Sequence, residues 1–240
     1  MIWLSSRKPW MDAKAGGVPV TPRYGKVVEI NALWYNALIV ISNLAYSYGE
    51  DGTYFKKIAE KTKASFIQSF WNEDKQCLYD VIRLDFKDDR VRPNQILAIS
   101  LTNAVIENEK AEKIVQKVWE ELYTDFGLRS LSPKSDEYKG IYIGEQYTRD
   151  SAYHQGTAWA WLSGHFITAY IRAFGKKSLH DKRVQGFIEP FKDHIKDACI
   201  GSISEIFDGD KPYIPRGCIS QAWSVGEILR AYVEDILGGL

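Results

Sequence analysis

Two acidic residues, Asp12 and Glu205, stand in loops of similar character near opposite ends of the chain. Asp12 lies in WMDAKAGG, ahead of an apolar segment that opens at Glu29, and Glu205 lies in GSISEIFDGD, ahead of the apolar segment SQAWSV. Asp12 precedes Asn31 by 19 residues, and Glu205 precedes Gln221 by 16. Two carboxylates that face one cavity can hydrolyse a glycosidic bond, since one protonates the leaving oxygen and the other activates water. We therefore take this pair as the candidate catalytic groups.

Four segments begin with an amide side chain and continue into apolar and aromatic residues. Aligning Asn31, Gln95, Gln155 and Gln221 gives spacings of 64, 60 and 66 residues. This regularity indicates a repeated unit of two helices.

The hydrophobic pattern predicts two kinds of helix. Asn31–Tyr48 and Ala158–Phe174 are apolar nearly all round, which is typical of buried helices. Tyr54–Phe70 and Glu109–Tyr123 carry apolar residues on one face only, as helices on a protein surface do. Ser178–Cys199 is predicted to be a third outer helix, which Pro190 restarts or kinks.

The alternation of inner and outer helices predicts an all-α fold. We expect about seven helices of a concentric double-layered barrel, in a single domain over residues 1–240. Antiparallel neighbours place the N-termini of all inner helices at one end, so the long loops, and the two acids, should gather there. Cys77–Phe86 is expected to hold a short hairpin within such a loop.

Polar groups and flat aromatic rings at the mouths of the inner helices predict a sugar site, because sugars present hydroxyls and apolar C–H faces. The candidate binding residues are Trp10, Glu29, Asn31, Trp34, Tyr35, Arg92, Asn94, Gln95, His154, Gln155 and Trp223. Simpler interpretations stay open. Glu29 also suits the positive end of a helix dipole, His154 also suits a buried core, and Arg92 or Arg149 also suits a surface ion pair. Trp159 and Trp161 fit packing better than binding.

Composition argues against several classes of partner. The chain has 240 residues with 31 Lys+Arg and 31 Asp+Glu, so charge favours neither nucleic acid nor an anionic membrane. Aromatic residues make up 13%. Three widely spaced cysteines indicate reduced thiols in a soluble cytoplasmic protein, and no signal peptide or membrane span is expected. The spacing of His and Cys predicts no metal, and no cofactor motif is present.

Several motifs resemble a known family. WMDAKAG, TPRYGKVVEINALWYNAL, RPNQILAISL, GLRSLSP, YHQGTAWAWLSGHF, SISEIFDGD and GCISQAWSVGEILRA are similar to the glucosidase domain of bacterial and archaeal glycogen debranching enzymes, from Trp10 to about Ala231. The resemblance implies an (α/α)6 barrel related to glucoamylases. It also implies an amylo-α-1,6-glucosidase that cleaves α-1,6-linked glucose of glycogen or limit dextrin with inversion. Asp12 matches the general acid of that family, and Glu205 matches its general base.

The resemblance also implies that part of the family's barrel lies outside this chain. The family usually has Thr where this chain has Pro9, and its upstream inner helices and β-rich domain have no counterpart here. We therefore expect the flanks near Trp34 and Ile228 to be open, and to be covered by self-association or by a partner that carries the upstream half. A non-catalytic sugar-binding subunit and a glucoamylase- or trehalase-like hydrolase remain alternatives.

Overall fold

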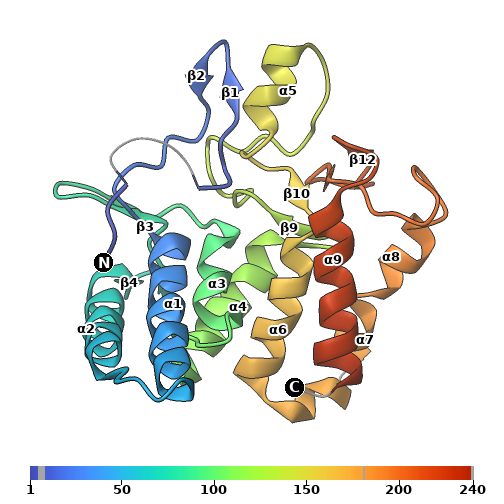
Figure 1. The fold of residues 1–240 in the computed structure, drawn as a ribbon. Helices are drawn as coiled ribbons and strands as arrows, with labels where there is room; N and C mark the ends of the chain where they lie inside the picture. The colour runs from blue at the N-terminus through green and yellow to red at the C-terminus, as the bar shows by residue number, and fades with distance from the viewer. Residues whose placement is uncertain (5–8, 181, 239–240) are drawn as a thin grey trace.

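A computed structural model describes residues 1–4, 9–180 and 182–238 of the chain. Helices dominate it, in two layers (Figure 1). The inner layer holds α1 (Val28–Ser47), η1 with α3 (Pro93–Ile96 and Leu97–Ser100), α6 (Leu162–Phe174) and α9 with the π-helix η3 (Ala222–Arg230 and Ala231–Leu237). The outer layer holds α2 (Thr53–Phe70), α4 (Asn108–Leu122), η2 (Lys176–His180), α7 (Lys182–Gly186) and α8 (Glu189–His194).

The inner helices form an arc. α1 packs against α3, α3 against α6, and α6 against α9, while α2 and α4 pack on the outside of α1 and α6. Figure 1 shows that α1, α6 and α9 all start at the end where the loops gather and run away from it, and that the outer helices return. The expected alternation and the common placement of the inner N-termini are therefore confirmed.

The outer helices follow their sequence pattern. Ala111, Ile114, Val115, Val118 and Leu122 of α4 are buried, whereas Glu112 and Glu120 between them are exposed and Lys113 and Lys117 are half-buried. On the inner helix α6, buried residues occur on all sides, as predicted. Gly164 of α6 lets α9 approach closely, because a Cβ there would clash with the carbonyl oxygen of Glu227.

Other boundaries differ from the prediction. Ala158–Trp159 is a strand, β10, so the third inner helix starts at Leu162 and the motif HQGTAWAW forms a turn and a strand instead of a helix start. Hydrophobicity alone does not separate a short buried strand from a buried helix. The predicted outer helix Ser178–Cys199 is broken into η2, α7 and α8, with Pro190 in the first turn of α8.

Short strands in the loops form small sheets at the site end. β8 (Tyr123–Thr124), β9 (Gly127–Arg129), β10, β11 (Ile206–Phe207) and β12 (Pro215–Arg216) make an antiparallel sheet in the order β12-β11-β10-β9-β8. β3 (Lys26–Val27) pairs with β6 (Val81–Ile82), and β6 pairs with β7 (Lys87–Asp88), so a hairpin does start within Cys77–Phe86. The other pairs are β1 (Lys14–Ala15) with β2 (Val18–Pro19) and β4 (Trp71–Asn72) with β5 (Cys77–Leu78). These sheets link loops that are far apart in sequence, and α5 (Gln146–Ala152) lies over them.

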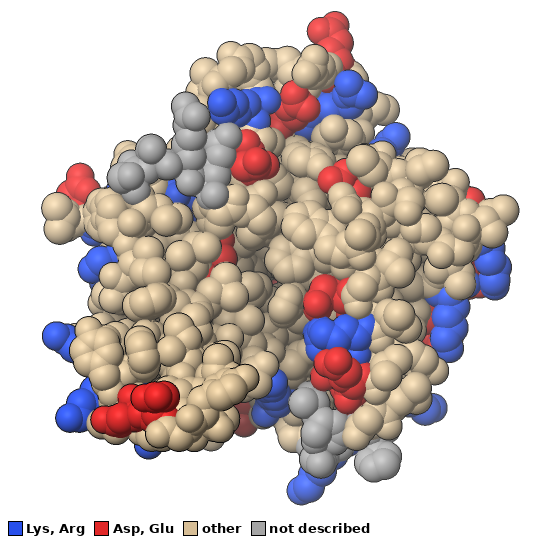
Figure 2. Space-filling model, viewed as in Figure 1, with Lys and Arg blue, Asp and Glu red and all other residues tan. Residues whose placement is uncertain are grey.

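The two ends of the arc expose apolar side chains. The exposed apolar residues are Leu33, Val40, Ile41, Leu44 and Tyr46 on α1, Tyr48 directly after it, and Trp223, Leu229, Val233 and Leu237 on α9 and η3. The expectation that α1 is buried all round is therefore wrong for one of its faces, and Ile228 is buried while Leu229 is exposed. Figure 2 shows a largely uncharged surface over α1 and a receding surface between α1 and α9.

Helix α1 is long and apolar enough to cross a membrane. Among the described residues it is the one such helix, over Val28–Ser47, and 39% of its most apolar window is buried within the fold. Glu29 and Asn31 in its first turn are buried in polar contacts, as in the core helix of a globular domain.

Candidate active site

Glu205 lies at the wall of a cavity of about 640 Å³. Glu205 directly precedes strand β11 and is only 8% exposed. The hydroxyl of Tyr153 donates a hydrogen bond to Oε1 (2.5 Å), and the backbone N–H of Cys218 donates one to Oε2 (3.0 Å). The two donors, one on each oxygen, fix the orientation of the Glu205 carboxylate at the cavity wall.

The rest of the cavity is polar and aromatic. It is lined by Tyr142, Ile143, Gly144, Arg149, Tyr153, Glu205, Arg216, Gly217 and Cys218. Arg216 pairs with Asp208, with 3.0 Å between Nη2 and Oδ2, so its charge is directed to that carboxylate. Arg149 is exposed at the rim. Aromatic rings beside hydroxyl, carboxylate and guanidinium groups suit a sugar ligand.

Asp12 lies in a different environment. Its side chain, between Trp10 and β1, is 63% exposed, and its Oδ1 lies 4.0 Å from Nε2 of His154. Burial and the nearby charges of Arg92 and Arg23 lower the pKa of His154 to about 3, so this imidazole is neutral. Within the described ranges, the carboxylate of Asp12 accepts no hydrogen bond and pairs with no Lys or Arg.

Glu205 and Asp12 contact two consecutive residues of one segment. Tyr153 contacts Glu205, and the next residue, His154, contacts Asp12. This segment joins α5 to β10 at the loop end of the arc, where β1, α5, β10 and β12 gather (Figure 1). The structure therefore brings the predicted pair to one end of the fold and to one peptide segment.

Tryptophans surround His154 and Asp12. The ring of Trp10 packs edge-on against His154 (5.2 Å between centroids), Trp159 (5.0 Å) and Trp161 (5.2 Å). Trp223 stacks on Trp161 at 5.2 Å and is 38% exposed. Of these rings, Trp223 is the one that offers an exposed face to a sugar, whereas Trp10 is half-buried. The expectation that Trp159 and Trp161 pack instead of bind agrees with their burial, although they lie outside α6.

Glu29 is held in a buried ionic network, so it is no longer a candidate sugar-binding residue. Nη1 and Nη2 of Arg23 bind its two carboxylate oxygens at 2.5 and 2.6 Å, and the same guanidinium binds Asp80. Asp80 also accepts from Asn94, whose Oδ1 accepts from Nε1 of Trp10. All these charged groups are buried, so the network fixes the loop ahead of α1 instead of facing a ligand.

Four other predicted binding residues also have structural roles. Arg92 donates to the backbone carbonyls of Ser130 and His154 and to Oε1 of Gln155. Asn31 binds the backbone at Ile2 and Val27, and Gln95 binds the backbone at Leu78 and Arg92. The residues Asn31, Arg92, Gln95 and Gln155 are at most 5% exposed. Their amide and guanidinium groups are used to hold loops together.

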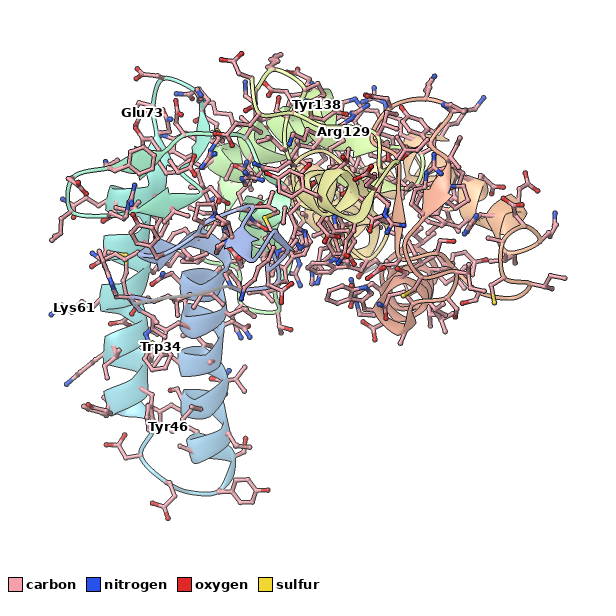
Figure 3. All side chains as sticks on the ribbon, turned by 90° about the horizontal axis from the view of Figure 1, so that it is seen from above. Trp34, Tyr46, Lys61, Glu73, Arg129 and Tyr138 are labelled. Carbon is pink, nitrogen blue, oxygen red and sulfur yellow. The ribbon has the colours of Figure 1, made fainter. Side chains whose placement is uncertain are left out.

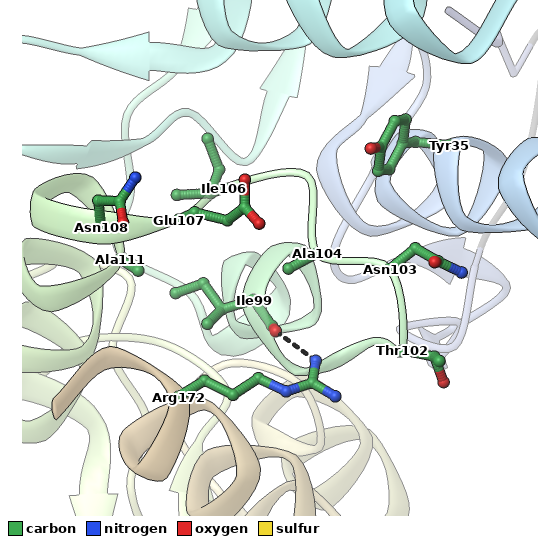
Figure 4. A pocket seen from close by; sticks show the side chains of 10 residues that line it. All are labelled: Tyr35, Ile99, Thr102, Asn103, Ala104, Ile106, Glu107, Asn108, Ala111 and Arg172. Atoms are coloured by element: carbon green, nitrogen blue, oxygen red, sulfur yellow. Dashed lines mark hydrogen bonds between the residues drawn. The ribbon is translucent and has the colours of Figure 1, made fainter. Parts of the chain in front are cut away.

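Trp34 and Tyr35 lie on α1, away from the Glu205 cavity. Figure 3 shows Trp34 in the α1–α2 hairpin. Tyr35 lines a separate pocket of about 480 Å³ with Asn103, Glu107 and Arg172 (Figure 4). The helical period turns these aromatic residues toward α2 and the α3–α4 loop, a direction that the sequence pattern did not specify.

The sequence prediction missed Tyr153, Gly217 and Cys218. All three adjoin residues that were singled out: Tyr153 precedes His154 in YHQG, and the other two open the motif GCISQAW. For Tyr153 the available signal was a polar side chain next to a predicted site residue, but its direction depends on the turn between α5 and β10. Gly217 and Cys218 gave no such signal, because they act through a missing side chain and a backbone N–H.

Comparison with known proteins identifies the family of the chain. The sequence profile of the amylo-alpha-1,6-glucosidase family matches residues 3–230. The chain belongs to this family. It is also 27% identical over 204 residues to the glycogen debranching enzyme of Saccharomyces cerevisiae, a match that covers 67% of this chain and 13% of that protein. The chain thus spans a small part of this much longer relative.

Solved glycoside hydrolases share the fold. The neutral trehalase Nth1 from Saccharomyces cerevisiae matches with a TM-score of 0.63 at 14% identity, over 86% of this chain and 37% of that chain. The family 15 glucoamylase from Hypocrea jecorina matches with a TM-score of 0.57 at 13% identity, over 97% of this chain and 45% of that chain. These neighbours are (α/α)6 barrels, so the two-layered arc corresponds to part of such a barrel.

Proposed function

We propose that this chain carries the catalytic pair of an inverting α-1,6-glucosidase, with Asp12 as general acid and Glu205 as general base. The substrate is glucose linked α-1,6 at the branch points of an α-glucan such as glycogen or limit dextrin. One observation carries the proposal: adjacent residues, Tyr153 and His154, contact the two acids, and two hydrogen bonds fix the carboxylate of Glu205.

The contacts of Glu205 suit a base. Its carboxylate accepts from Tyr153 and from the backbone of Cys218 and forms no ion pair among the described residues. The carboxylate is therefore held in a fixed orientation, and no cation of those residues competes with a water molecule for it. A water molecule in the cavity, hydrogen-bonded to Glu205, would lose its proton to this carboxylate as it attacks the anomeric carbon.

The contacts of Asp12 suit an acid. Its only ion-pair neighbour in the described part of the chain is His154, which is neutral because burial disfavours the imidazolium. No Lys or Arg of the described residues pairs with this carboxyl group, so it is free to approach the leaving glycosidic oxygen of a bound glucan. Its exposed side chain also leaves room for a bulky glucan on the leaving-group side.

Family membership supports the substrate class. The profile that matches residues 3–230 is that of an amylo-alpha-1,6-glucosidase, and the yeast relative is a glycogen debranching enzyme. Tyr142, Tyr153 and the exposed face of Trp223 supply aromatic surfaces for glucose rings near the two acids. We assign no cofactor and no metal to this reaction, and we propose a cytoplasmic location.

A second candidate is a barrel subunit that depends on a partner for activity. The exposed apolar faces of α1 and α9 favour it, because a soluble monomer rarely exposes large contiguous apolar patches. In this case residues 1–240 form part of a single barrel domain, and the uncovered faces pack against the upstream half of the barrel or against a second copy. A trehalase- or glucoamylase-like hydrolase is the alternative for specificity.

Hydrolysis of a branched limit dextrin by the chain, alone and mixed with a polypeptide that carries the upstream barrel helices, tests the proposal. We expect glucose release that is weak for the chain alone and strong for the mixture, since positioning supplies much of catalysis. Trehalose and linear maltooligosaccharides serve as competing substrates. Hydrolysis of either in preference to the branched dextrin, or of none of them by the mixture, would overturn the assignment.

A further inference from the structure

The loop around Gly217 is shaped to hold the carboxylate of Glu205. Gly217 adopts a φ of +66°, a conformation that favours glycine. A Cβ built at this position would clash with Oε2 of Glu205 and would lie 3.4 Å from its Cβ. The absence of a side chain at Gly217 therefore lets the next residue, Cys218, bring its N–H to Oε2 at 3.0 Å.

Tyr153 holds the other oxygen. Its hydroxyl donates to Oε1 at 2.5 Å, and its ring is fixed by packing against Trp159 (4.9 Å between centroids) and Tyr142 (5.6 Å). Burial and the contact with Glu205 raise the pKa of the Tyr153 hydroxyl, so this group remains a hydrogen-bond donor throughout the physiological range. One oxygen of the carboxylate is thus fixed by a side chain and the other by the backbone.

We propose that Tyr153 and Gly217 are positioning residues for Glu205, which together fix the orientation of the general base. The role of Glu205 as a base rests on the proposed function, but the contacts that position its carboxylate do not depend on that role. Tyr153→Phe would remove the donor to Oε1 while keeping the ring. Gly217→Ala would push the Oε2 side of the carboxylate away from the N–H of Cys218.

The chain offers matched controls for both changes. The hydroxyl of Tyr138 donates to Oδ1 of Asp210 at 2.8 Å, so Tyr138→Phe removes the same kind of bond away from Glu205. Gly201 has a φ of +80° and open space around its Cβ direction, so Gly201→Ala imposes similar backbone strain without displacing a carboxylate.

The split between kcat and KM of glucan hydrolysis is the first readout. Tyr153→Phe should lower kcat by about 10-fold to 100-fold, the size expected for one hydrogen bond to a charged group, with little change in KM. Gly217→Ala should lower kcat more than Gly201→Ala does. If Tyr153 had a merely structural role, Tyr153→Phe would lower kcat no more than Tyr138→Phe does.

The thiol of Cys218 gives a second readout that needs no activity. The charge of Glu205 raises the pKa of this exposed thiol, whereas Cys77 is buried and its pKa is raised to about 11. In a Cys199→Ser background, iodoacetamide at pH 7.5 therefore reports mainly on Cys218. Glu205→Gln should speed its alkylation, because the substitution removes the charge that raises the pKa of this thiol. Tyr153→Phe should give an intermediate rate, because a freed carboxylate moves away, and Tyr138→Phe should match the parent.

The two readouts separate the inference from the proposed function. An intermediate alkylation rate together with a lower kcat at nearly unchanged KM for Tyr153→Phe supports both. The predicted alkylation pattern in a chain that hydrolyses no glucan, even with the upstream half, supports the positioning and overturns the glucosidase assignment. If Glu205→Gln speeds alkylation while Tyr153→Phe leaves both the alkylation rate and kcat unchanged, Tyr153 does not position Glu205.

Discussion

Tyr153 and Glu205 lie 52 residues apart in the chain and are joined by a 2.5 Å hydrogen bond from the tyrosine hydroxyl to Oε1. This bond crosses from the α5–β10 connection to the loop that precedes β11. Because His154 follows Tyr153 and lies 4.0 Å from Asp12, the bond also relates the two predicted catalytic acids to one another. The site is therefore held together by loops and small sheets, while the helices place those loops at one end.

The pH dependence of stability should report on His154. Its pKa is about 3 in the folded chain and 6.5 when unperturbed, so between these values the unfolded chain binds a proton that the folded chain does not. The free energy of unfolding must therefore fall as the pH falls through this window. Between pH 7 and pH 5 this one group should contribute a loss on the order of 2 kcal/mol.

Urea unfolding of the parent and of His154→Gln at pH 7 and pH 5 measures this contribution. The variant should lose less stability on acidification, by about that amount. The pKa values of His165 and His194 are also lowered by burial, and both residues are present in both proteins, so their effects cancel in the comparison. Equal losses for parent and variant would show that His154 is not buried as a neutral imidazole.

Arg23→Met should be strongly destabilising. The substitution leaves the carboxylates of Glu29 and Asp80 buried without their shared cation, a change that typically costs about 3–5 kcal/mol. Chemical denaturation measures the loss. Lys196→Met, which breaks an exposed pair with Asp193, is the matched control and should leave the denaturation midpoint nearly unchanged. Similar small effects for both variants would mean that the Arg23 network is accessible to water.

The exposed apolar faces of α1 and α9 should drive association. Leu44→Ser and Leu229→Ser remove side chains that are 53% and 58% exposed, so they should weaken association with little cost to folding. Sedimentation velocity at micromolar concentration should show a smaller average species for these variants than for the parent. Leu84→Ser is the control, because Leu84 is 98% exposed on the β6–β7 loop, away from both helices. A monomeric parent, alone and with the upstream half, would contradict this prediction.

The sequence predicted the helical layers because their information is local. The stripe of α4, for example, follows from residues within 15 positions of each other. The roles of Glu29 and Arg92 were not predictable in this way, since each depends on partners that the fold supplies: Glu29 on Arg23, and Arg92 on residues of the Ser130 and His154 loops. An acid or amide at a helix start looks the same whether it faces a ligand or a buried guanidinium.

Strand β10 shows a second limit of the sequence. Ala158–Trp159 is apolar and continuous with α6, so its hydrophobic pattern matches a helix. Its conformation is decided by pairing with β9 and β11, which bring Arg129 and Phe207 opposite Ala158. Pairing partners so far away in the chain leave no periodic trace in a single sequence. The position of Tyr153 beside Glu205 depends on this same pairing.

The central claim, that Asp12 and Glu205 are an inverting acid–base pair, is tested most directly by the anomer of glucose released from a branched limit dextrin. Proton NMR of the chain with the upstream half should show β-glucose first, because inversion at an α-linkage gives the β-anomer. Asp12→Asn and Glu205→Gln should each lower the rate by about 10²–10⁴ while leaving thermal stability nearly unchanged. Release of α-glucose first, or a near-full rate in either variant, would contradict the claim.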